Sequence, residues 1–164
     1  MPSPRTDALR PGGLPSHRDR PLGSRHLARR VVARALTGAL CFGAVSALAG
    51  ALIAIPGHGG GFPLDALEDT PFTSFVIPGL ILGVVVGGTQ LTAAIAMVRR
   101  SPARLLLASI AGFGMLIWIF TELAMIGYSV LQTVYFALGT VELILVLALL
   151  GVAPRMVGPD DQGQ

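Results

Sequence analysis

The chain has 164 residues, of which 52% are apolar and only 13% are charged. This length suits a single domain, but the composition is too apolar and too poor in charge for an ordinary soluble one. All twelve basic residues are arginine, and the single cysteine, Cys41, excludes an intramolecular disulfide. We therefore expect an integral membrane protein and find no motif for nucleic-acid binding.

The first 30 residues are rich in Pro, Gly, Ser and Arg and contain few large apolar side chains. They bury too little surface to offset the entropy of ordering, so residues 1–30 are expected to form a disordered tail. With Arg34 included, eight arginines minus Asp7 and Asp19 give this region a formal charge of +6. Such a tail would stay in the cytoplasm and attract anionic lipid by about 1 kcal/mol per residue near the surface.

Arg29 and Arg30 also stand before an apolar run, as in a twin-arginine signal, and Ala47-Leu48-Ala49 has the small residues of a cleavage site. The apolar run, however, continues through Ile55 and is longer than a usual signal core. We expect this segment to remain as the first membrane span.

Four stretches approach the roughly 20 apolar residues that cross about 30 Å of hydrocarbon as a helix. In a bilayer each segment must satisfy its own backbone polar groups, so each stretch should be helical. The expected fold is all-α, a polytopic bundle with its transmembrane domain at 31–153 and a short tail at 154–164. The predicted helices are 31–55, 75–98, 105–126 and 133–153.

The connections differ in charge. Arg99, Arg100 and Arg104 make the turn between the second and third helices basic, whereas the first loop, 56–74, carries only acidic charges. Because arginine-rich connections stay inside, we predict a multi-pass protein of a bacterial plasma membrane with both termini in the cytoplasm. His58 and the loop carboxylates lack a ligand spacing, so no metal and no cofactor are expected.

The second helix contains Gly79, Gly83 and Gly87, a repeated pattern of small residues one turn apart. Glycines in this spacing let another helix approach closely, and in lipid such shape complementarity drives helix association. The first helix offers a matching small stripe that includes Gly43. The glycine face could pack within the chain, form a homo-oligomer or bind a membrane-protein partner.

Two carboxylates lie inside the predicted spans. Glu122 lies about 8 Å below the outer end of the third helix, and Glu142 about 14 Å into the fourth. Such residues are costly in lipid and indicate a functional site by default. No basic residue is available at that depth, so each must be protonated, hydrogen-bonded to a neutral donor or bound to a cation.

Helical spacing places Trp118 on the face of Glu122, and Tyr135 on the face of Glu142. Gln90 and Gln132 could supply neutral hydrogen-bond partners. If the two faces meet, a pocket lined by Trp118, Tyr135 and both carboxyls would open toward the outer leaflet.

Three roles remain open for these side chains: hydrogen bonding between helices, proton- or cation-coupled transport, and binding of a small molecule or lipid between the third and fourth helices. No nucleophile, cofactor motif or metal cluster accompanies the carboxylates. We therefore expect a non-enzymatic accessory or structural component of the membrane rather than an enzyme.

The absence of Lys and Asn beside abundant Ala, Gly, Arg and Pro is typical of GC-rich coding. Several short motifs resemble those of a group of small actinobacterial four-helix membrane proteins with no established activity. The resemblance implies a location and an architecture, and covers about residues 35–150. Its motifs are Thr70-Pro71-Phe72, Ile77-Pro78-Gly79, Arg99-Arg100, Trp118-Ile119 with Glu122, Leu131-Gln132, and Tyr135-Phe136 with Gly139.

Overall fold

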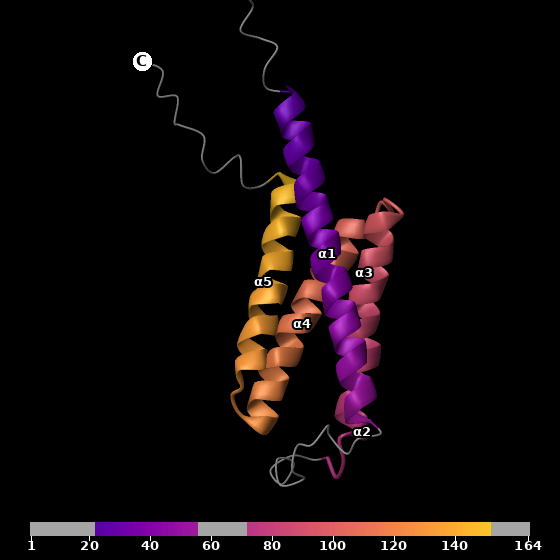
Figure 1. Ribbon diagram of the computed structural model, residues 1–164, viewed down its shortest axis with the longest axis vertical. Coiled ribbons are helices and arrows are strands. Elements are labelled where there is room, and N and C mark those ends of the chain that lie inside the picture. Colours follow the sequence, from indigo (N-terminus) through magenta and orange to yellow (C-terminus); the bar gives the residue numbers. More distant parts are fainter. Residues whose placement is uncertain (1–21, 56–71, 152–164) are drawn as a thin grey trace, which may run out of the picture.

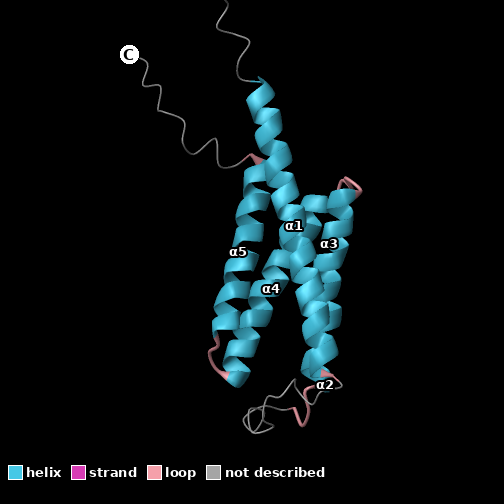
Figure 2. Cartoon of the chain, viewed as in Figure 1, coloured by secondary structure: helices cyan, strands magenta, loops and turns pink. Residues whose placement is uncertain are grey.

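The computed structural model describes residues 22–55 and 72–151, which form four long helical spans packed side by side (Figures 1 and 2). Each span is long and apolar enough to cross a membrane, and together they confirm the predicted all-α bundle of a multi-pass membrane protein. The apolar ranges are His26–Ala54, Val76–Val98, Arg104–Met125 and Val130–Leu150.

Helix α1 covers Leu22–Ala54 and so begins before residue 31, the predicted start of the first helix. Leu, Ala and Arg are good helix formers, and a helix that exists downstream extends by one hydrogen bond for each residue added. Arg29 also donates from Nη2 to the carbonyl oxygen of Leu149 at 3.4 Å, which ties this extension to the end of the last helix. The rest of the predicted tail, residues 1–21, lies outside the described residues, as do loop residues 56–71 and the tail after Gly151.

The second span consists of three consecutive helical segments. These are α2, Val76–Leu80; η2, Ile81–Gly87; and α3, Gly88–Val98. The middle segment is a π-helix, whose hydrogen bonds join residues five apart instead of four. The predicted helix 75–98 has the right extent, but hydrophobicity carries no signal for this change of winding.

Helices α4 (Arg104–Ile126) and α5 (Val130–Leu150) form an antiparallel hairpin with a short turn. Gly127 has φ 75° at the end of α4, and the turn ends at Ser129. A capping box, in which the Ser129 and Gln132 side chains satisfy each other's backbone N–H groups, starts α5 before the predicted residue 133. Gly151, with φ 76°, ends α5 before the predicted residue 153.

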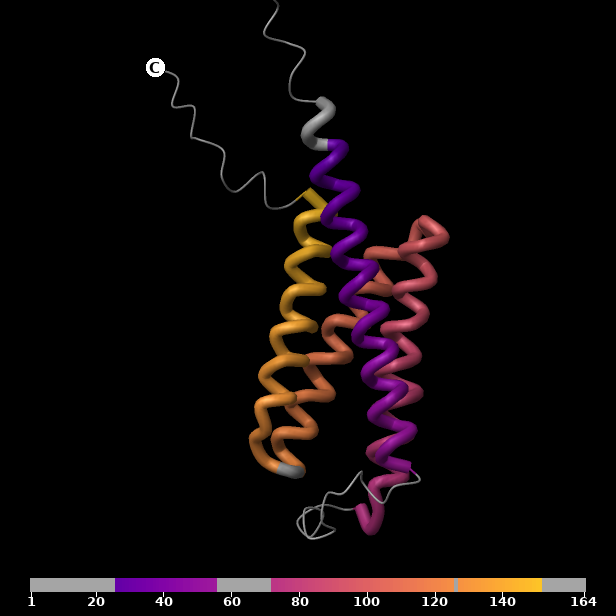
Figure 3. The backbone as a smooth tube through the Cα atoms, in the orientation of Figure 1, coloured from indigo at the N-terminus to yellow at the C-terminus, as the bar shows by residue number. Residues whose placement is uncertain are grey.

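The tube drawing shows α1 running beside the second span, and α5 beside α4 (Figure 3). Helix α1 also packs against α5, and α3 against α4, which closes the bundle. Many of the buried side chains between the spans are small, and alanines such as Ala93, Ala108 and Ala111 are fully buried. Large apolar side chains, including Val45, Val84 and Ile117, instead face outward. This arrangement is that of a protein whose surroundings are lipid.

Candidate functional site

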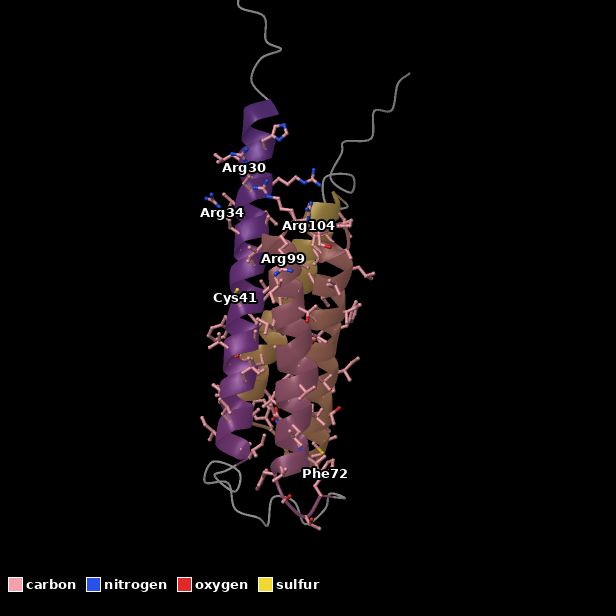
Figure 4. The ribbon with its side chains drawn as sticks, turned by 90° about the vertical axis from the view of Figure 1, so that its right-hand side faces the viewer. Arg30, Arg34, Cys41, Phe72, Arg99 and Arg104 are labelled. Carbon is pink, nitrogen blue, oxygen red and sulfur yellow. The ribbon has the colours of Figure 1, made fainter. Side chains whose placement is uncertain are left out.

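The two ends of the bundle differ in charge. Every arginine whose side chain the structure describes lies at the end that holds the start of α1, the turn after α3 and the end of α5 (Figure 4). These residues are Arg29, Arg30, Arg34, Arg99, Arg100 and Arg104. Phe72 and the α4–α5 turn mark the other end.

A ladder of close contacts joins α1 to the second span. A Cβ placed on Gly79 would lie 3.2 Å from Cβ of Ala54, and one on Gly83 only 2.8 Å from Cβ of Ala51. A Cβ on Gly87 would lie 3.2 Å from the Leu48 side chain. The glycine face therefore packs against α1 of the same chain.

The ladder continues to a polar side chain. Gly43 lies further along α1, toward its start, and a Cβ there would lie 3.0 Å from Cδ and Oε1 of Gln90. Glycine at position 43 thus makes room for an amide that would otherwise collide with α1. The sequence pattern of small residues on both helices marked this contact, but it gave Gln90 no partner.

That partner is Glu142. Nε2 of Gln90 donates to Oε2 of Glu142 at 2.9 Å, and both side chains have 0% exposure. The same Nε2 lies 3.5 Å from the carbonyl oxygen of Ala111. This pair links α3 to α5. Helix α4 lies beside it, and Gly112 of α4 and Gly139 of α5 allow α4 and α5 to approach closely. It lies in the middle of the bundle.

Two oxygens of this pair are buried without a partner among the described residues, Oε1 of Gln90 and Oε1 of Glu142. Both are acceptors when the carboxyl is ionised, whereas a protonated carboxyl carries one donor. A neutral acid could therefore exchange two hydrogen bonds with the amide, as the reciprocal pair of a carboxylic acid and a carboxamide does. The geometry supports the interhelical hydrogen-bonding role for Glu142.

A cavity of about 440 Å³ lies nearer the other end of the bundle, between α1, α2 with η2, α4 and α5. Its walls are mainly apolar, with aromatic side chains from α4 and α5. Trp118, Tyr135 and Glu122 line it, together with Ser46, Gly50, Ala54, Pro78, Leu82, Met115 and Tyr128 among others. Trp118 is 8% exposed, so its ring forms part of the inner wall. This size and composition are those of a small-molecule pocket.

Glu122 and Glu142 are not brought into one pocket. Glu122 lines the cavity and is half-buried, but Glu142 is not among the lining residues and bonds Gln90 instead. The expectation of a pocket with two carboxyls therefore fails for Glu142, because Gly139, one turn earlier on α5, lies against α4 at Gly112 and keeps that face inside the packed core. Trp118, Tyr135 and Glu122 are brought together as expected.

Gln132 is also engaged elsewhere. Its Oε1 accepts from the backbone N–H of Ser129 at 2.9 Å, and its Nε2 donates to the carbonyl oxygen of Gly127 at 2.9 Å. Both bonds are local, because a residue three positions into a helix reaches back to its cap. Gln132 holds the α4–α5 turn and pairs with neither carboxyl.

Sequence reasoning missed the contribution of α1 to the pocket. Ser46, Gly50 and Ala54 form one wall, and they lie beside the small stripe that packs on the glycines. Their spacing of four residues was a usable signal, since it places all three on one face of the helix.

Comparison with known proteins finds no family model that matches the chain, no matching curated protein and no matching solved structure. The resemblance to the actinobacterial membrane proteins therefore stays a prediction.

Proposed function

We propose that this protein is a non-enzymatic accessory component of a bacterial plasma membrane that binds a small, largely apolar molecule in the cavity between its four spans. The observation that carries this proposal is the cavity of about 440 Å³, walled by all four spans and lined by Trp118 and Tyr135. A cavity this large in a bundle with many buried alanines forfeits dispersion contacts unless a ligand or a lipid chain fills it.

In this proposal both termini are cytoplasmic. The described arginines all lie at one end, and basic segments are retained inside. The pocket would then be nearer the outer leaflet, where a membrane-dissolved ligand could enter. The arginine-rich end would contact anionic lipid headgroups.

The orientation is tested by labelling single cysteines in intact cells. With Cys41 replaced by Ser, we would introduce Ser101→Cys at the basic turn or Ser129→Cys at the opposite end. A membrane-impermeant maleimide should label position 129 in intact cells and position 101 only after permeabilisation. The reverse pattern would overturn the proposed orientation.

Ligand binding is tested through Trp118, the only tryptophan of the chain. Bromine quenches indole fluorescence on contact, so 1-bromo-4-neopentylbenzene reports entry into the pocket of the protein in lipid nanodiscs. We expect saturable quenching in the wild type. Partition into lipid alone would instead give quenching that rises without saturation.

Two phenylalanine variants separate these cases. Ser46→Phe places a ring in the pocket wall. Val45→Phe places the same ring at the neighbouring position, which is not part of the lining and whose side chain is 68% exposed. With the pocket filled by Ser46→Phe, the Kd obtained from the saturable quenching should rise at least about tenfold, which corresponds to about 1.4 kcal/mol of binding free energy. Equal quenching curves in the two variants would overturn the proposed pocket function.

A proton- or cation-coupled carrier that uses both Glu122 and Glu142 is supported less well, because only Glu122 lines the cavity. Homo-oligomerisation through the glycines is supported less well too, because α1 packs against Gly79, Gly83 and Gly87.

A further inference from the structure

Glu122 stands out among the residues of the pocket by its charge. It lies one turn after Trp118 on α4, so the carboxyl and the indole share a face of the helix. Among the described residues that line the cavity none is Arg, Lys or His, and no other is acidic. Within the described part of the lining, Glu122 is therefore the single carboxyl or basic side chain.

The described part of the chain offers Glu122 no counter-charge. No hydrogen bond or ion pair to its carboxyl is found within residues 22–55 and 72–151. The nearest arginine along α4 is Arg104, and 18 residues of helix separate the two by about 27 Å. An attraction over that distance is weak compared with the cost of a carboxylate in an apolar site.

Glu142 shows how the same fold satisfies a carboxyl that serves packing. That group is fully buried and accepts a hydrogen bond from Gln90. Glu122 has neither feature, since it is half-buried and faces the cavity. A ligand in the cavity can therefore pair with the Glu122 carboxyl, which no described residue does.

The neighbouring side chains narrow the ligand class. Trp118 and Tyr135 present aromatic rings, whose faces attract cations, and a carboxylate attracts the same charge. An anion would meet an unfavourable charge, and a neutral molecule would gain at most a hydrogen bond from Glu122, whereas a cation also gains the attraction of the charge. The mostly apolar walls require an apolar body on the same ligand.

We propose that the pocket takes an amphipathic organic monocation, such as an alkyl or aryl ammonium, with its charged head beside Glu122 and the rings of Trp118 and Tyr135. This inference rests on the proposed binding function of the cavity and assigns its ligand class.

The test compares two ligands of the same shape. In (4-bromobenzyl)trimethylammonium a charged nitrogen replaces the central carbon of the neopentyl group in 1-bromo-4-neopentylbenzene. Quenching of Trp118 is measured with each ligand in nanodiscs, for the wild type and for Glu122→Gln. We expect the variant to weaken binding of the cation about tenfold or more and to change binding of the neutral ligand less than about twofold.

Glu142→Gln is the matched control, because it makes the same chemical change outside the pocket. It should leave the affinity for the cation within about twofold of the wild type. Near-ultraviolet circular dichroism and thermal unfolding of each variant check that the bundle is intact. If Glu122→Gln does not fold, Glu122→Asp takes its place. It keeps the charge but moves it, and it should weaken binding of the cation and not binding of the neutral ligand.

The outcomes separate the two proposals. Saturable binding of the neutral ligand, with cation binding absent or unaffected by Glu122→Gln, would overturn the monocation and leave the pocket. No saturable binding of either ligand would overturn the pocket function, and the monocation with it.

Discussion

Gln90 and Glu142 meet in the middle of the bundle through a hydrogen bond of 2.9 Å from Nε2 to Oε2, and neither side chain reaches the surface. They belong to the second and fourth spans, so this one bond joins helices that no short loop connects. Replacing either side chain tests how much the bundle depends on it.

Glu142→Leu should lower the free energy of unfolding by about 1 to 3 kcal/mol, because one N–H of the buried Gln90 amide loses its partner. Glu142→Gln should lower the free energy of unfolding by less than about 0.5 kcal/mol. The new amide can accept from Nε2 of Gln90 and donate to the unpartnered Oε1 of Gln90. Unfolding in mixed micelles with increasing denaturing detergent measures both. An equal loss in the two variants would mean that the carboxyl itself is required.

The double variant Gln90→Leu with Glu142→Leu should recover much of the loss of Glu142→Leu, because removing both partners leaves no polar group unpaired. The same unfolding measurement completes a double-mutant cycle. Additive losses would argue against direct coupling of the pair.

Gly83→Ala should destabilise the protein by about 1 to 3 kcal/mol, because the new Cβ would lie 2.8 Å from Cβ of Ala51 and force the helices apart. Gly88→Ala is its control: it lies in the same span, and no atom lies within 4 Å of a Cβ there. That change should stabilise by up to about 1 kcal/mol through helix propensity. Detergent unfolding of both variants checks the contrast, and a harmless Gly83→Ala would contradict the ladder of close contacts.

Ser129→Ala should cost about 0.5 to 2 kcal/mol through loss of the α5 cap. The effect should be local, with faster amide hydrogen exchange in the first turn of α5. Exchange at the end of α5, near Leu149, serves as the internal control. Uniformly faster exchange along the helix would instead indicate that the whole hairpin depends on the cap.

Arg29→Gln should increase hydrogen exchange at the end of α5, because Arg29 donates to the carbonyl oxygen of Leu149 and places a positive charge at a helix C-terminus. The expected cost is small, about 0.3 to 1 kcal/mol. Arg30→Gln, one residue further along α1 and exposed, should leave that exchange unchanged. Equal changes in both variants would point to a general effect of charge.

The sequence predicted the four spans because hydrocarbon imposes a helix on any apolar segment of sufficient length. It also located the packing face of the second span, since Gly79, Gly83 and Gly87 leave a groove that only another helix fills. The start of α1 was missed, because residues 22–30 resemble a polar tail in composition and are held as helix by propagation and by the contact of Arg29.

The candidate site was predictable in its members but not in its pairings. Glu122 and Trp118 share a face by helical spacing alone, and both line the cavity. The partner of Glu142 depends on how the second and fourth spans are rotated about their axes, which periodicity does not determine. By sequence, Gln132 could bond either a carboxyl on another helix or the backbone at the start of α5. It bonds the backbone of Ser129 and Gly127, and these local bonds form without bringing distant segments together.

The π-helix at η2 has a consequence for how this chain could change. Each of its hydrogen bonds encloses one residue more than an α-helical bond does, so the second span carries an extra residue for its length. The glycines lie before or within this segment and Gln90 lies after it. Deleting one residue of η2 would restore regular α-winding over the same length, so Gln90, which follows this segment, would stay beside Glu142. The second span can therefore lose one residue within η2, whereas a deletion in the regular helix between η2 and Gln90 would turn Gln90 away from Glu142.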